Sequence, residues 1–257
     1  MARKPFMAGN WKMNLDHLEA IAHVQKIAFG LNDEDFAEVE AGVMVPFTDI
    51  RSVQTLVDAD DLKVVYGSED ISAHDKGAYT GEISGSMLSK LGCTYAVIGH
   101  SERRQYHGED DAIVNAKVKA AYSHGLTPIM CIGEVKEERE AGIQEQVTLG
   151  QLAGGLADIP ADQAATIVIA YEPVWAIGTG LTATPQDAQD MCGAIRGRLT
   201  ELYGSEVAEA IRIQYGGSVK SANAAEIMAG PDVDGALIGG ASLDADEFVA
   251  ICKYRLA

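Results

Sequence analysis

A single carboxylate follows an apolar segment in the second half of the chain. Residues 166–171 read Thr-Ile-Val-Ile-Ala-Tyr, a β-branched run typical of a strand buried on both faces, and Glu172 comes directly after it. Pro173 holds Glu172 extended, because a residue before proline is disfavoured in the α region. Residues 178–180 (Gly-Thr-Gly) predict a small flap able to fold over the acid. An acid fixed at a strand end beneath a flap indicates a general base that removes a proton away from water.

A histidine follows another apolar strand. His100 comes after residues 95–99 and heads the polar segment Ser101-Glu102-Arg103-Arg104, which has the character of a short helix. The positive end of a helix lowers the pKa of an adjacent histidine. We therefore expect His100 to be a neutral imidazole with a lowered pKa.

An asparagine and a lysine end the first strand. Asn10 and Lys12 are two residues apart, so strand alternation places both side chains on one side and Trp11 on the other. The formal net charge is −18, from 38 acidic and 20 basic residues. A site for an anionic substrate must create its own positive potential against that background, which makes Lys12 informative.

Two glycine pairs follow the last two strands. Gly216 and Gly217 precede Ser218, and Gly239 and Gly240 follow the final strand. Glycines let backbone N–H groups approach an oxyanion closely, and barrel enzymes commonly bind phosphate after strands seven and eight. The two pairs together predict a phosphate site.

The elements that position these residues alternate regularly along the chain. Strand-like runs are predicted at residues 6–11, 43–46, 63–67, 95–99, 127–132, 166–171, 211–215 and 235–238. Helical patterns lie between them, and one begins with Thr184 as N-cap, Pro185 in the first turn and Asp187 three residues past the cap. Eight such units without a linker predict an α/β fold, a single (β/α)8 TIM barrel catalytic domain over residues 1–257, with its chemistry at the C-terminal strand ends. An open doubly wound sheet is the alternative.

Composition narrows the class of protein further. The negative charge argues against nucleic acid or an anionic membrane as a partner. No apolar run reaches the ~18 to 20 residues of a membrane span, and the N-terminus lacks a signal-peptide core, so a cytoplasmic location is expected. Four cysteines without CxxC spacing indicate reduced, structural thiols.

The sequence supports neither a dinucleotide site nor a metal site. Residues 178–183 match the GxGxxA form of a dinucleotide fingerprint, but they neither leave a strand directly nor open a helix. The six histidines form no HExxH pair or comparable cluster, so no metal site and no cofactor are predicted.

Several motifs, in order and spacing over nearly the whole chain, resemble the triosephosphate isomerase family. They are Ala8-Gly9-Asn10-Trp11-Lys12-Met13-Asn14, Ile98-Gly99-His100-Ser101-Glu102-Arg103-Arg104, Cys131-Ile132-Gly133-Glu134, residues 170–180, Tyr215-Gly216-Gly217-Ser218 and Gly239-Gly240-Ala241-Ser242. Many family members have Lys-Thr-Ala after the flap, where this chain has Leu181-Thr182-Ala183. This difference concerns the rate of flap opening rather than the chemistry.

The resemblance implies a cofactor-free interconversion of dihydroxyacetone phosphate and D-glyceraldehyde 3-phosphate through an enediol(ate), a step of glycolysis and gluconeogenesis. Glu172 would transfer the proton between the two carbons, and neutral His100 would polarise the carbonyl. Lys12 would stabilise the enediolate and phosphate charge, and Asn10 would hold Lys12 and the substrate oxygens in register. Glu102 would pair with Lys12.

The resemblance also assigns phosphate-binding and supporting residues. Backbone N–H groups of Gly178, Ser218 and Gly240 would bind the phosphate, with Gly239 shaping the turn. Ser101 and Ile177 are expected to support the site, Ile177 by covering the carboxylate of Glu172. A further set of residues, 75–82 around Thr80, resembles a loop that reaches into a second subunit, which implies a homodimer.

Two other functions remain as alternatives. A Schiff-base aldolase on the same scaffold would need a lysine at a mid-barrel strand end, but strands four to six end in His100, Glu134 and Glu172. A phosphate-binding barrel without catalysis would not need a base, an electrophile and a cation together.

Overall fold

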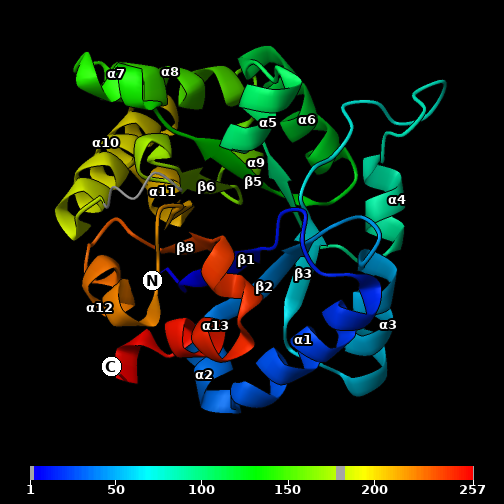
Figure 1. Cartoon of the computed structure of the whole chain (residues 1–257). Coiled ribbons are helices and arrows are strands. Elements are labelled where there is room, and N and C mark those ends of the chain that lie inside the picture. The colour runs from blue at the N-terminus through cyan, green and yellow to red at the C-terminus, as the bar shows by residue number, and fades with distance from the viewer. Residues whose placement is uncertain (1–2, 178–182, 257) are drawn as a thin grey trace.

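The computed structural model describes residues 3–177 and 183–256, and its strands form a closed parallel barrel in sequence order. The helices of the described chain surround the strands (Figure 1). The strands are β1 (Phe6–Asn10), β2 (Glu40–Val45), β3 (Val65–Ser68), β4 (Tyr95–Ile98), β5 (Thr127–Ile132), β6 (Val168–Tyr171), β7 (Arg212–Tyr215) and β8 (Gly235–Ile238). Pairing of β1 with β8 closes the barrel, so the predicted TIM barrel is confirmed and the open sheet is excluded.

Helices follow the strands as the alternating pattern predicts. They are α1 (His17–Gly30), α2 (Asp33–Glu38), α3 (Ile50–Asp60), α4 (Gly85–Lys90), α5 (Ser101–His107), α6 (Asp111–Ser123), α7 (Lys136–Glu140), α8 (Gln144–Gly155), α9 (Ala161–Ala164), α10 (Pro185–Tyr203), α11 (Ser205–Ala210), α12 (Ser221–Met228) and α13 (Ala245–Cys252). The short 3-10 helices are η1 (Val174–Ala176), η2 (Gly240–Leu243) and η3 (Tyr254–Leu256). The predicted start of α10 is confirmed, because Thr184 and Asp187 form a reciprocal capping box around Pro185. In the described chain, no helix combines the length and apolar character that crossing a membrane requires.

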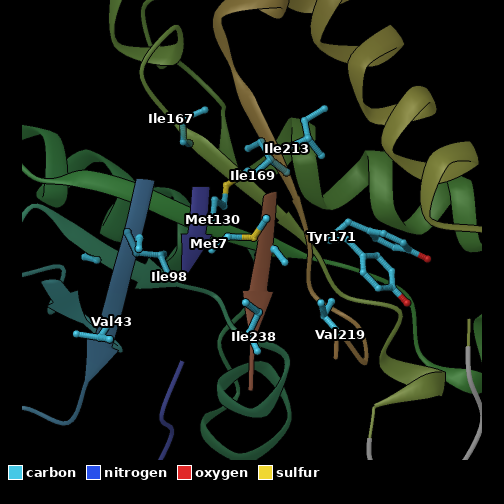
Figure 2. Packing of buried hydrophobic residues seen from close by; sticks show 14 of the residues in the cluster. Met7, Val43, Ile98, Met130, Ile167, Ile169, Tyr171, Ile213, Val219 and Ile238 are labelled. Atoms are coloured by element: carbon cyan, nitrogen blue, oxygen red, sulfur yellow. The ribbon is translucent and has the colours of Figure 1, made fainter. Parts of the chain in front are cut away.

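Strand alternation divides the core into two clusters. The smaller cluster fills the barrel and includes Phe6, Ala8 and Ala170. The larger cluster lies between strands and helices, and Figure 2 shows part of it, including Ile169 and Ile213, which are paired across β6 and β7. Because successive side chains point to opposite faces, a strand-end residue that continues the inward series enters the barrel mouth. All four cysteines of the chain are buried free thiols.

Strand alternation alone accounts for the positions of two predicted site residues. Asn10 continues the inward series of Phe6 and Ala8, and Glu172 continues the inward series of Ala170. Both side chains are buried, with 4% of Asn10 and 2% of Glu172 exposed. The sequence pattern of β1 and β6 therefore directs these two polar groups into the mouth.

The connection between β3 and α4 projects from the body of the barrel (Figure 1). Thr80 is exposed within it, and Gly77 and Gly81 have φ values of +129° and +94°, which other residues adopt only with strain. The rings of His74 and Tyr79 stack with centroids 3.7 Å apart. The projecting loop therefore carries its own internal contact.

Candidate active site

One cavity of about 350 Å³ opens at the C-terminal ends of the strands. The residues that line it are Asn10, Lys12, His100, Glu172, Ile177, Gly216, Gly217, Ser218, Val219, Lys220, Leu237, Gly239, Gly240 and Ala241. They come from the ends of β1, β4, β6, β7 and β8 and from the turns that follow. Residues far apart in sequence thus converge because parallel strands end at one rim. Gly178, for which the resemblance implied phosphate binding, lies outside the described residues.

The end of β6 is held tightly against the turn after β5. The backbone N–H of Glu172 donates to the Ile132 oxygen over 2.8 Å. Gly133 packs so closely behind it that an added Cβ would lie 1.8 Å from the Glu172 backbone oxygen. The Gln151 side chain accepts from the Gly133 N–H at 2.8 Å. The backbone that carries the carboxylate therefore has little freedom to move toward β5.

Three donors surround the Glu172 carboxylate. The Ser101 N–H donates to Oε2 over 2.9 Å, and the Ser101 hydroxyl donates to Oε1 over 3.1 Å. His100 Nε2 lies 2.9 Å from Glu172 Oε1. The N-terminus of α5 thus supplies every one of these contacts.

These contacts shift the pKa values of both partners. Burial alone would raise the pKa of Glu172, but its interaction with His100 and the two Ser101 hydrogen bonds together hold that pKa below its ordinary value of 4.5. For His100, burial acts in the other direction and would lower the pKa, but the Glu172 carboxylate outweighs burial and raises the pKa of His100. The predicted lowering of the His100 pKa is therefore wrong for this conformation, because the helix end contacts the Glu172 carboxylate, a contact that the sequence did not reveal.

The tautomer of His100 follows from its other nitrogen. The backbone N–H of Glu102 donates to Nδ1 over 3.2 Å, so Nδ1 carries a lone pair. The neutral ring then carries its proton on Nε2, where it donates to Glu172. His100 turns into the cavity because Gly99 before it adopts φ of +69° and interrupts the alternation of β4.

Lys12 reaches the cavity by a different route from the one predicted. Strand β1 ends at Asn10, and Lys12 lies beyond it in a left-handed conformation with φ of +56°. Strand alternation is therefore not what places Lys12 beside Asn10. Instead, the Lys12 N–H donates to the Asn10 side-chain oxygen over 3.1 Å. Lys12 Nζ pairs with Glu102 Oε1 at 2.5 Å, the pairing that the resemblance implied.

The two glycine pairs lie in turns that line the cavity. Gly216 donates its N–H to the Tyr171 oxygen over 2.7 Å, which ties the turn after β7 to the strand end of β6. Gly239 caps η2, which begins at Gly240, and an added Cβ on Gly239 would lie 3.5 Å from Cε of Lys12. The open backbone of this turn therefore lies next to the site's cation.

A buried acid holds the turn that follows Glu172. Glu134 Oε1 accepts from Trp175 Nε1 at 2.8 Å and from the Tyr171 hydroxyl at 3.1 Å. Arg139 lies over the Trp175 ring, 4.6 Å from its centroid, and pairs with Asp187 at the start of α10. These contacts connect the turn after Glu172 with the helix that follows the flap.

Lys220 is a cavity residue that sequence reasoning missed. It is exposed, caps α12 and adds a second positive charge to the cavity rim. The sequence did hold an indication of this position, because Lys220 follows the Gly216-Gly217-Ser218 turn by two residues. Leu237 was missed because its apolar side chain looked like ordinary barrel filling.

The fold and the cavity together define an α/β-barrel enzyme for a small anionic substrate, with a carboxylate, an imidazole and an ammonium group in one enclosed space. Comparisons with known proteins specify the class. The triosephosphate isomerase family model matches residues 5–255. The chain is 68% identical over 253 residues to the triosephosphate isomerase of Streptomyces coelicolor, covering 98% of each chain. It is 62% identical over 251 residues to that of Nocardia farcinica, covering 98% of this chain and 96% of the relative.

A solved structure gives the same relationship. The crystal structure of triosephosphate isomerase from Bartonella henselae has a TM-score of 0.87 and 40% sequence identity to this chain, and the match covers 99% of this chain and 100% of the other. The chain belongs to the triosephosphate isomerase family. It is an isomerase that interconverts dihydroxyacetone phosphate and D-glyceraldehyde 3-phosphate in glycolysis, and members of the family are typically dimers. The aldolase and the non-catalytic barrel are thereby set aside.

Proposed function

We propose that Glu172 is the base that moves the proton between the two substrate carbons, and that His100 is the electrophile that polarises the carbonyl. The observation that carries this assignment is the 2.9 Å contact of Glu172 Oε1 with His100 Nε2 in the cavity that Lys12 also lines. A base and a hydrogen-bond donor this close can act on neighbouring atoms of a three-carbon substrate. His100 would donate protons to the two enediol oxygens and accept protons from them.

The base must exchange its partners before it acts. In the conformation described above, Ser101 and His100 occupy the carboxylate oxygens and lower the pKa of Glu172. A move of the side chain toward the substrate gives up these hydrogen bonds while the site stays buried. Because burial raises the pKa of a carboxylate, the move makes Glu172 a stronger base at the moment of proton transfer.

Positive charge and backbone donors would stabilise the developing anion. Lys12 lies beside Asn10 and faces the Gly239 turn, so its ammonium group is placed to interact with both the enediolate oxygen and the phosphate. Asn10 holds the backbone of Lys12. The N–H groups of Ser218 and Gly240, together with that of Gly178, would bind the phosphate oxygens, and Gly239 would shape the turn.

Ile177 would close the site over the carboxylate. It is half-buried and lines the cavity together with Glu172. An apolar side chain over the base excludes water and favours its basic, desolvated form. Every step of this scheme uses side chains and backbone groups of the chain, without a cofactor.

Isotope incorporation tests proton transfer directly. With dihydroxyacetone phosphate as substrate in D₂O, trapping of the product by a coupled dehydrogenase should give D-glyceraldehyde 3-phosphate that carries solvent deuterium on the carbon that receives the proton. A base that exchanges its proton with solvent gives this result, whereas a hydride shift between the carbons gives none. Product free of deuterium, together with near-normal turnover in Glu172→Gln, would overturn the proposed role of Glu172.

We also propose that this chain forms a homodimer through the surface beside Lys12. A second cavity of about 410 Å³ adjoins Lys12 and includes Met13, which is 95% exposed, and Tyr106, which is 72% exposed. Large exposed apolar side chains next to a cavity indicate a protein interface. The projecting loop with Thr80 would enter this cavity on the second copy.

Loop shortening tests the dimer. Replacement of residues 75–82 by a short glycine linker should give a monomer by light scattering, with reduced isomerase activity because the surroundings of Lys12 lose their packing. A shortened variant that remains dimeric, or a monomer with full activity, would contradict the proposal.

The remaining inferences concern the context of the enzyme. We infer that residues 1–257 form one catalytic domain and that it works in the cytoplasm, where its phosphorylated substrates occur. Support comes from the closed barrel and from the acidic composition, which disfavours nucleic acid and anionic membranes as partners. Fractionation of cells that express the tagged protein tests the location, and enrichment in the membrane fraction would contradict it.

A further inference from the structure

A histidine of α1 lies beneath the turn that follows β8. His23 is partly buried, and its Nε2 lies 2.8 Å from the backbone oxygen of Ser242. A carbonyl oxygen only accepts hydrogen bonds, so Nε2 carries a proton and donates. Burial lowers the pKa of His23, so the neutral ring with its proton on Nε2 is the form present at pH 7.

Ser242 closes the turn to which Gly239 and Gly240 belong. Its N–H and its hydroxyl both donate to the Gly239 oxygen, over 2.8 Å and 2.7 Å. Ser242 is fully buried and packs on Gly9 of β1, where an added Cβ would lie 2.9 Å from Cβ of Ser242. The packing on Gly9 and the hydrogen bond from His23 therefore both attach the turn to the rest of the barrel.

His23 also contacts the strand end that carries the cation. Its ring meets the Trp11 ring edge-on, with centroids 5.3 Å apart and planes at 86°. Trp11 is fully buried and directly precedes Lys12. One side chain thus touches both sides of the anion site, the β1 end with Lys12 and the β8 turn with Gly240.

We propose that His23 is a positioning residue for the anion site, holding the turn after β8 and the end of β1 at the separation that binds the substrate phosphate. This inference rests on the proposed function, in which Gly240 and Lys12 bind that phosphate. Groups held in place before binding cost less to order when the ligand arrives, so affinity depends on the hydrogen bond from His23. In the proposed function the carbons react beside Glu172 and His100, so the effect falls more on binding than on turnover.

The matched variants separate the hydrogen bond from the ring. His23→Phe keeps an aromatic ring against Trp11 but removes the donor and leaves the Ser242 oxygen unpaired. The Kd for inorganic phosphate and the KM for dihydroxyacetone phosphate should rise about three- to tenfold, with a smaller change in kcat. His23→Gln restores a side-chain N–H and should recover part of the loss. His17→Phe places the same substitution at an exposed position of α1 and should leave both constants unchanged.

A merely structural role gives a different pattern. Loss of folded enzyme lowers kcat and the melting temperature while KM stays constant, and that result for His23→Phe would overturn the proposal. If His23→Phe does not fold, His23→Met provides a flexible donor-free replacement for the same comparison.

Amide NMR of the unaltered protein tests the underlying assumption. Inorganic phosphate should shift the N–H signals of Gly240 and Ala241 in a titration. If these signals do not move, the turn is not the anion site, and the phosphate assignment fails together with this inference. If they move but His23→Phe binds phosphate as tightly as the parent, the phosphate assignment stands and the role of His23 is wrong.

Discussion

His100 Nε2 lies 2.9 Å from Glu172 Oε1, so the proposed electrophile donates a hydrogen bond to the proposed base. The contact stabilises the ionised carboxylate, and it also raises the pKa of the imidazole. A substrate that enters between these two groups must replace this bond with bonds of its own. The free energy of substrate binding therefore includes the loss of the hydrogen bond between His100 and Glu172.

Removal of the Ser101 hydroxyl should raise the pKa of Glu172. The hydroxyl donates to the ionised form of the carboxylate, so Ser101→Ala removes a stabilisation of the charged state and shifts the pKa upward toward its ordinary value of 4.5. The Ser101 N–H bond remains in the variant. The shift is measured as the titration midpoint of the ¹³C-labelled Glu172 carboxyl between about pH 3 and 6, with Glu172→Gln to assign the signal. An unchanged or lower midpoint would contradict the hydrogen-bond account.

A methyl group at Gly133 should displace Glu172, the proposed base. Its Cβ would lie 1.8 Å from the Glu172 backbone oxygen, so the strand end must move to accept it. Because misplacement by about 1 Å can cost 10²-fold in rate, kcat/KM should fall about 10- to 100-fold in Gly133→Ala. Gly150→Ala is the control, since the Gly150 position in α8 has open space around it and alanine favours helix by about 0.5–1 kcal/mol. Equal activity of the two variants would show that the Gly133 contact does not position the base.

Lys117 should matter for stability far more than its neighbour Lys119. Lys117 is buried and its ammonium lies 2.6 Å from both Asp70 and Glu109. Lys117→Met leaves two carboxylates without this partner and should lower the free energy of unfolding by about 3–5 kcal/mol in urea at fixed protein concentration. Lys119 is exposed and its Nζ lies 3.9 Å from Asp158. Lys119→Met should therefore change the free energy of unfolding by less than about 1 kcal/mol. Similar losses in both variants would count against the buried network.

Lys12 should carry most of the affinity for the phosphate. Lys12→Met removes the positive charge beside the Gly239 turn, and the Kd for inorganic phosphate should rise at least about tenfold while isomerase activity is mostly lost. Lys12→Arg should keep part of the binding with poorer geometry. Lys220→Met removes the exposed rim cation and should have a smaller effect. Unaltered phosphate affinity in Lys12→Met would remove Lys12 from the anion site.

The sequence was most informative where a side chain follows a strand without interruption. Asn10 and Glu172 were expected at the ends of apolar strands and both line the cavity there, and the capping pattern at Thr184 located the start of α10. Lys12 and His100 enter the cavity through residues with positive φ, at Lys12 itself and at Gly99, which alternation does not describe. The contact of Glu172 with His100 joins strand ends 72 residues apart. Its effect on the pKa of His100 therefore became visible only in three dimensions.

Substitution of the base tests the central claim most directly. Glu172→Gln keeps the size of the side chain and can still accept a hydrogen bond from Ser101, but it cannot accept the substrate proton. Turnover in a coupled isomerase assay should fall by at least the ~10²–10⁴ that loss of a general base costs, while the Kd for inorganic phosphate stays within about twofold of the parent. Near-normal turnover in Glu172→Gln would contradict the account.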